Sequence, residues 1–154
     1  MHVLTKKLKN QEGFTLLELL IVIVIIGILA LIIVPGLASG PKRARDAQRK
    51  SDLRAVKNAL ETYYNDSNTY PAGASYAGLS SNLVTAYLPS MPADPKNTGV
   101  YVYTYQATAG PNGAGANCAA TPCGSYVIQG HLENTTDSQK KAGTTDTYEV
   151  VGVN

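Results

Sequence analysis

Apolar residues are concentrated in one long segment near the start of the chain. Sixteen consecutive apolar or glycine residues occupy 19–34, and the wider segment 14–38 is interrupted only by Thr15, Glu18 and Pro35. A helix over the wider segment would be about 37 Å long, more than the roughly 30 Å hydrocarbon core of a bilayer. The pattern therefore predicts one membrane-spanning helix over 14–38.

The residues that follow, 39–64, are predicted to form an amphipathic helix. Leu53, Val56 and Leu60 recur there at helical spacing, while arginine and lysine fill the other face. Residues at this spacing form one apolar stripe, which we expect to pack against a sheet.

The remaining residues, 65–154, combine short alternating runs with long polar loops. Alternation of side chains between two faces is the pattern of half-buried strands. Strands are predicted over 100–107, 126–133 and 148–153, and a short helix within 79–88. The expected fold is therefore α+β, with a long N-terminal helix packed on a small antiparallel sheet of three to four strands.

Charge is distributed as unevenly as hydrophobicity. Residues 42–64 hold seven basic and three acidic side chains, whereas 65–154 hold three basic and six acidic ones. Within the helix, the i,i+4 spacing predicts the ion pairs Asp46–Lys50 and Lys57–Glu61.

The basic stripe of Arg45, Arg49 and Arg54 allows a nucleic-acid interpretation. Interleaved aromatic residues and a base-reading motif are absent from it. We therefore interpret the stripe as a solvated face, or as a face that packs against acidic neighbours in an assembly. Contact with DNA is kept as an alternative.

Glu18 requires a partner, because a carboxylate at membrane depth costs about 2–3 kcal/mol or more when it is unpaired. A short polar leader with Lys6, Lys7 and Lys9 precedes the apolar segment. Positive charge on this side predicts that the leader stays in the cytoplasm.

The segment from Gly13 to Ala30, which begins GFTLLE, closely resembles the class III signal of type IV prepilins and type II secretion pseudopilins. The resemblance implies cleavage after Gly13 by a prepilin peptidase that also N-methylates Phe14. It also implies that the new amine of Phe14 pairs with Glu18 of a neighbouring subunit. Each buried charge is costly alone and far less so when paired, so the pair would also set the register of assembly. Pro35 is implied to mark a segment that kinks or melts when subunits pack.

Four segments follow from this interpretation. They are a cleaved cytoplasmic leader over 1–13, a transmembrane and filament-core helix over 14–38, an amphipathic helix over 39–64 and a globular head over 65–154.

The resemblance implies a structural subunit of a type IV pilus-like filament. The precursor would lie in the cytoplasmic membrane as a single-pass protein, and the processed chain would polymerise with itself into a cell-surface pilus. An assembly platform and a motor ATPase would act on it indirectly. Three alternatives remain open: a major-type type II secretion pseudopilin in a periplasmic pseudopilus, a DNA-uptake pilus subunit, and an anchored monomer.

The stretch 91–103 bears on this choice, because it resembles the loop before the first strand of major pseudopilins. In that loop a tryptophan usually follows Asp-Pro, and Lys96 occupies the place here. We take this departure, together with the cysteine loop described next, to favour a pilus subunit.

Cys118 and Cys123 are separated by four residues in a stretch rich in glycine, alanine and proline. In an exported head, this spacing predicts a small disulfide loop. A zinc site would need further ligands, and His2 and His131 are the only histidines in the sequence.

One polar loop raises the question of calcium, which related pseudopilins bind in such a loop. The candidate ligands are Asn134, Asp137, Ser138 and Asp146, and their spacing matches no EF-hand.

Catalysis is not expected, because His131 has no nucleophile and carboxylate at a useful spacing. A non-enzymatic chain without a required cofactor is therefore predicted.

Overall fold

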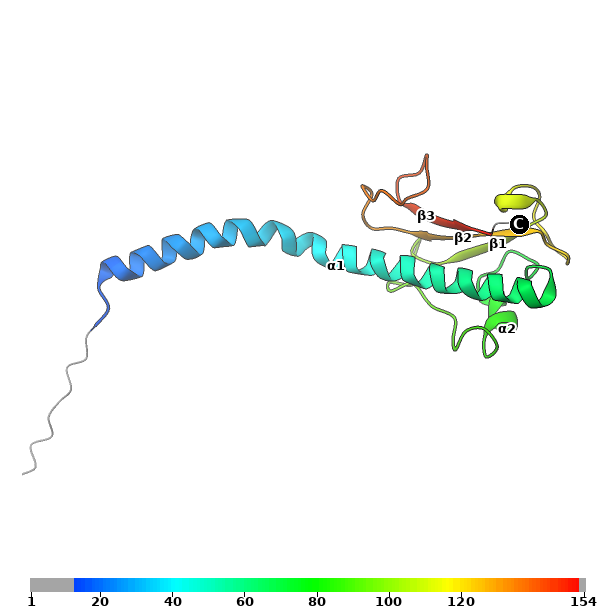
Figure 1. The fold of residues 1–154 in the computed structure, drawn as a ribbon. Coiled ribbons are helices and arrows are strands. Elements are labelled where there is room, and N and C mark those ends of the chain that lie inside the picture. Colours follow the sequence, from blue (N-terminus) through cyan, green and yellow to red (C-terminus); the bar gives the residue numbers. More distant parts are fainter. Residues whose placement is uncertain (1–12, 153–154) are drawn as a thin grey trace, which may run out of the picture. The chain divides into compact units, whose positions relative to one another are not determined.

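The computed structural model describes residues 13–152, apart from the side chains of residues 33–38. The chain divides into two compact units, Met1–Ser39 and Gly40–Asn154. Helix α1, Leu16–Ser67, contributes its first part to one unit and its second part to the other (Figure 1). Except for Gly13, the predicted leader lies outside the described residues.

Helix α1 continues through the positions that could have interrupted it. Its backbone is helical at Pro35, Gly36, Gly40 and Pro41. A proline removes one backbone hydrogen bond, which a long helix tolerates when the turns on both sides are formed. The halves predicted over 14–38 and 39–64 therefore lie in one element of 52 residues.

The large apolar side chains that the structure describes in the first unit are exposed. Among the large ones, the exposed fraction ranges from 49% at Ile21 and Val22 to 90% at Phe14. In the part of the chain that the structure describes, no helix is both long and apolar enough to cross a membrane.

The second unit contains a three-stranded antiparallel sheet in the order β1-β2-β3. Its strands are β1 Thr104–Thr108, β2 Ser125–His131 and β3 Thr147–Val151. Central strand β2 pairs Ile128 with Tyr105 on one side and with Val150 on the other. Short helices η1 Ala77–Leu79, α2 Ser80–Leu83 and η2 Pro111–Gly113 lie in the connections. The α+β prediction is confirmed.

Strand β1 begins four residues later than predicted, because a turn occupies the start of the alternating run. The amide of Tyr101 donates to the carbonyl of Thr98 at 3.0 Å. Asn97 and Gly99 both have positive φ, which suits a tight turn. Alternation alone could not separate this turn from the strand that follows it.

The predicted stripe on α1 forms one side of the core. Leu53, Val56 and Leu60 are fully buried and belong to one hydrophobic cluster with Tyr126 and Ile128 of β2. Figure 1 shows this part of α1 running along the sheet. Full burial of one leucine-sized side chain contributes about 1.5–3 kcal/mol, so the stripe holds the helix on the sheet.

Candidate functional site

Gly13 and Phe14 immediately precede helix α1. Phe14 is almost fully exposed, and a Cβ added at Gly13 would meet no other atom within 4 Å. The described residues therefore leave the predicted cleavage bond sterically open. Cleavage and N-methylation at this position stay predictions.

Glu18 has a local role that the sequence interpretation missed. Its backbone amide donates to Oγ1 of Thr15 at 3.2 Å, and its Oε2 accepts from both the amide and Oγ1 of Thr15 at 3.1 Å. This reciprocal arrangement is a capping box, which satisfies donors at the start of a helix. The signal was present in the sequence as threonine followed three residues later by glutamate. Glu18 therefore stabilises the start of its own helix, in addition to its predicted role in the assembly of subunits.

Pro35, the third residue predicted to act in assembly, has a helical backbone within α1. Its side chain lies outside the described residues. Its role in kinking or melting the helix stays a prediction.

A buried arginine lies at the centre of a charged cluster on the second half of α1. Arg49 is completely buried. Its Nε and Nη2 donate to the two carboxylate oxygens of Asp94 at 2.7 and 3.0 Å. Its Nη1 donates to Asp46 at 2.8 Å and to Glu133 at 3.0 Å. These four residues, called the Arg49 cluster below, connect α1 to two loops that are distant in sequence.

Glu133 is neutralised by two further cations. Arg45 donates to both of its oxygens at 2.6 and 2.7 Å, and Nζ of Lys96 lies 3.1 Å from it. Hydrogen bonds from Arg45 above all hold the pKa of Glu133 well below its usual range. Burial alone would raise the pKa of Asp94, but hydrogen bonds from Arg49 and from the Lys96 amide hold it below the usual value. Both carboxyls are therefore ionised at neutral pH.

The prediction of an ion pair between Asp46 and Lys50 is wrong. Asp46 pairs with Arg49 instead, and Nζ of Lys50 contacts Oδ2 of Asp137 at 2.5 Å. Asp46 also accepts the backbone amides of Glu133 and Asn134, at 2.8 Å each. An exposed i,i+4 pair is worth only a few tenths of a kcal/mol. Asp46 therefore pairs with buried Arg49 of the same helix and with two backbone amides of the head, and Lys50 pairs with Asp137 of the head.

The predicted pair Lys57–Glu61 is also absent from the described residues. Glu61 instead accepts hydroxyl hydrogen bonds from Tyr70 and Tyr126, at 2.9 Å each. Burial raises the pKa of both tyrosines, so both hydroxyls stay protonated donors.

The stripe proposed for DNA contact is divided between two environments. Arg49 is inaccessible to a ligand, and Arg45 is bound to Glu133. Arg54 is exposed, and so is Arg43, which lies two residues before Arg45 on the same helix. Arg49 lies four residues before Leu53, in register with the buried apolar stripe, and this spacing was the available signal for its burial.

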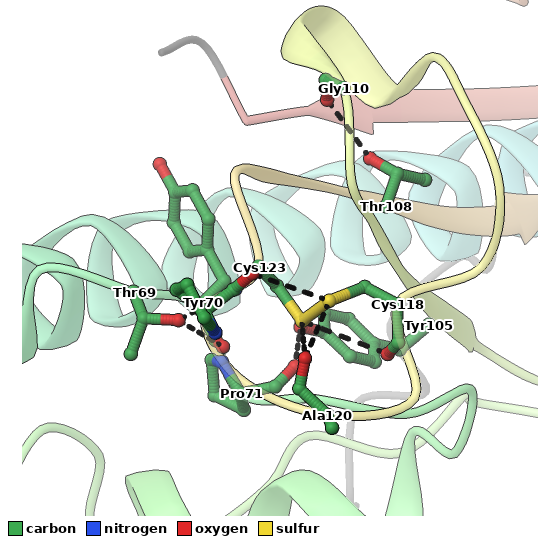
Figure 2. The surroundings of a disulfide bond; sticks show 10 residues. Thr69, Tyr70, Pro71, Tyr105, Thr108, Gly110, Cys118, Ala120 and Cys123 are labelled. Carbon is green, nitrogen blue, oxygen red and sulfur yellow. Dashed lines mark hydrogen bonds between the residues drawn. A yellow bond between two sulfur atoms is a disulfide. The ribbon is translucent and has the colours of Figure 1, made fainter.

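Cys118 and Cys123 form the predicted disulfide (Figure 2). The loop that it closes is attached to the residues after α1. The amide of Cys123 donates to Oγ1 of Thr69 at 2.8 Å, and its carbonyl accepts from the amide of Tyr70 at 3.1 Å. The disulfide therefore holds a small loop against the chain that leaves α1.

Three of the calcium candidates are bound by other protein groups in the described structure. Asp137 is paired with Lys50, and Oδ2 of Asp146 lies 3.1 Å from Nδ1 of His131. The side-chain oxygen of Asn134 accepts from the amide and hydroxyl of Thr136. Among the described residues, no group of three or more His, Cys, Asp or Glu side chains is placed to hold a metal ion. This donor set, with Asp137 paired to Lys50 and Asp146 in contact with the ring of His131, does not fit calcium.

Comparison with known proteins agrees with the N-terminal motif. Residues 8–34 match the family described as "Prokaryotic N-terminal methylation motif". The chain does not match a solved structure at a significant level.

Relatives over a longer part of the chain are named type II secretion system core protein G. The protein of Aeromonas hydrophila is 38% identical over 98 residues, which cover 56% of this chain and 68% of the relative. The protein of Pseudomonas aeruginosa is 34% identical over 116 residues, covering 67% of this chain and 80% of the relative. The protein of Escherichia coli K12 is 40% identical over 90 residues, covering 58% and 61%. The chain therefore belongs to the family of type IV pilins and type II secretion pseudopilins.

Proposed function

We propose that this chain is the major pseudopilin of a type II secretion system. The observation that carries the proposal is its similarity to core protein G over 116 residues in Pseudomonas aeruginosa, which is too long to be confined to the N-terminal motif. This similarity favours the secretion alternative over the surface pilus that we first expected.

The Lys96 substitution, which had favoured a pilus, has a structural explanation. Nζ of Lys96 lies 4.3 Å from the centre of the Tyr101 ring and 3.1 Å from Glu133. Its amide donates to Asp94 at 2.8 Å. A cation–π contact with an adjacent ion pair keeps this loop on the Arg49 cluster, so the missing tryptophan does not count against a pseudopilin.

In the proposed mechanism, a prepilin peptidase cleaves between Gly13 and Phe14 while the chain is anchored in the cytoplasmic membrane. The free amine of Phe14 then pairs with Glu18 of a neighbouring copy, in exchange for part of the capping box with Thr15. Exposed apolar side chains along the first half of α1 pack against those of other copies. A repeated contact that does not close on itself produces a helical filament. The assembly platform and motor ATPase act from outside this chain.

Two variants separate the charge of Glu18 from its capping role. Glu18→Gln keeps an oxygen that can accept from Thr15 but removes the anion, whereas Glu18→Ala removes both. We expect both precursors to be cleaved and N-methylated, as shown by intact mass. We also expect both to be missing from filaments pelleted from the released periplasm, because the incoming amine has no counter-charge. Assembly of Glu18→Gln at the wild-type level would contradict the proposed pairing.

Deleting the gene in the source cells distinguishes the proposed filament from its alternatives. A secretion pseudopilin predicts that exported proteins no longer reach the culture medium, while surface pili and DNA uptake persist. Complementation with the wild-type gene should restore export, and complementation with Glu18→Gln should not. Loss of pili or of DNA uptake with normal export would assign the chain to a surface filament instead.

A further inference from the structure

The loop between β2 and β3, residues 132–146, is attached to α1 by several charged side chains. The first attachment uses its backbone, since Asp46 accepts the amides of Glu133 and Asn134 at 2.8 Å. The second uses the side chain of Glu133, which is bound by Arg45 and Arg49 of the same helix. Both attachments lie at the first residues of the loop, where β2 has just ended.

The third attachment lies further along the loop. Nζ of Lys50 contacts Oδ2 of Asp137 at 2.5 Å, and the two side chains are only 13% and 16% exposed. The other oxygen of Asp137 accepts the amide of Gln139 at 2.8 Å, which closes a local turn. Nζ of Lys50 also lies 5.8 Å from the centre of the Tyr148 ring on β3. Lys50 therefore contacts the middle of the loop and the strand that follows it.

A calcium ion would need six to eight oxygen ligands, including carboxylates free to face it. The two aspartates of this loop face protein side chains instead: Asp137 faces the ammonium of Lys50, and Asp146 faces the ring of His131. An ammonium in contact with Asp137 supplies the positive charge that a bound cation would otherwise bring. Calcium binding by this carboxylate would require breaking a partly buried ion pair.

We propose that Lys50 holds the loop of residues 132–146 in place of a divalent cation, so that the head folds and keeps this loop ordered without calcium. The contact between Lys50 and Asp137 is called the Lys50 clamp below. The clamp concerns the head alone and is independent of which filament the chain builds.

Trypsin provides a direct probe of the loop, because Lys140 and Lys141 are cleavage sites within it. The processed full-length chain in detergent is digested briefly, and mass spectrometry gives the rate of cleavage after these two lysines. For the wild-type protein we expect equal rates and equal melting temperatures with EDTA and with millimolar calcium. Faster cleavage in EDTA, or a melting temperature raised by calcium, would overturn the proposal without any variant.

A matched pair of variants tests the lysine itself. Lys50→Met keeps the aliphatic stem near Tyr148 but removes the charge, and we expect loop cleavage to accelerate by about fivefold. Lys57→Met removes a lysine from the same helix, and among the described residues no ion pair joins Lys57 to the loop. It should leave the rate unchanged. Equal effects of the two variants would show that Lys50 does not hold the loop.

Charge reversal guards against simple misfolding of the variants. Lys50→Asp and Asp137→Lys should each accelerate amide hydrogen exchange of the loop, a readout that the new lysine at position 137 does not alter as it would alter tryptic cleavage, and the double variant should return the exchange close to the wild-type rate. A double variant whose loop exchanges as fast as the two single effects combined would overturn the clamp. Melting curves recorded on the same samples separate a loosened loop from global unfolding.

Discussion

At the scale of single residues, the head depends on one arginine. The Arg49 guanidinium is completely buried, hydrogen-bonded to three carboxylates and 4.8 Å from the centre of the Tyr101 ring. A planar fork of donors suits this position, because it can face a bidentate carboxylate and stack on an aromatic ring at once. Lysine would supply the charge without the geometry.

Replacing Arg49 with methionine should therefore destabilise the head by about 3–5 kcal/mol, since it leaves Asp94 and Asp46 buried without their counter-charge. Arg54→Met is the matched control, because Arg54 is an exposed arginine on the same helix. The control should change stability by less than about 0.5 kcal/mol. Denaturant unfolding followed by circular dichroism measures both. Similar stabilities for the two variants would show that the Arg49 cluster is not structurally important.

At the scale of elements, the end of α1 and its middle are held on the head by different kinds of contact. The middle is held by the apolar stripe and the Arg49 cluster. After the end at Ser67, Tyr70 is fully buried, and its backbone amide is held by the disulfide loop. The ring of Tyr70 lies 4.7 Å from that of Tyr126, which continues the contact onto β2. The disulfide therefore supports the connection between helix and sheet.

Removing the disulfide with Cys118→Ser and Cys123→Ser should lower the stability of the head by about 2 kcal/mol, the loop-closure value for so short a loop. The reason is that an open chain gains freedom in the unfolded state. Melting temperatures of the oxidised, reduced and double-serine proteins provide the check. The reduced wild-type protein and the double variant should agree, and no loss in either would mean that the attachment of Tyr70 survives without the bond.

At the scale of the whole molecule, ion pairs between α1 and the loops make the second unit sensitive to acid. The pKa values of Glu133, Asp94 and Asp137 are all held below those of free carboxyls by their cationic partners, although burial opposes the effect. Asp52 works in the opposite direction, because burial raises its pKa. The three lowered carboxyls outweigh this single raised one.

A group with a lowered pKa in the folded state stabilises the fold above the pKa of the unfolded chain, which is about 4 for these carboxyls. That contribution is lost as the pH falls from about 4 through the folded values. The melting temperature of the processed chain should therefore be nearly constant from neutral pH to about pH 5 and decline steeply below about pH 4. Glu133→Gln should start from a lower stability and decline less. An acid decline identical to that of the wild type would exclude Glu133 as a main contributor.

Much of the architecture could be predicted because it depends on patterns within short stretches. The stripe of Leu53, Val56 and Leu60 predicted both the helix and its buried face, and the structure confirms both. The start of β1 could not be placed, because the turn closed by Thr98 and Tyr101 overlaps the first residues of the alternating run. Thr15 and Glu18 show the opposite case, in which a local signal was available and was not used.

The amino-acid sequence by itself determined the N-terminal motif, the long helix with its apolar stripe, the antiparallel strands and the pairing of two nearby cysteines. Each depends on side-chain spacing along one segment. Only the tertiary structure decided which charges pair, since Arg49 and Asp94 are 45 residues apart and Arg49 and Glu133 are 84 apart. A charged side chain on a helix forms only weak ion pairs with residues four positions away. It exchanges them for buried, hydrogen-bonded partners only when folding brings distant loops to it.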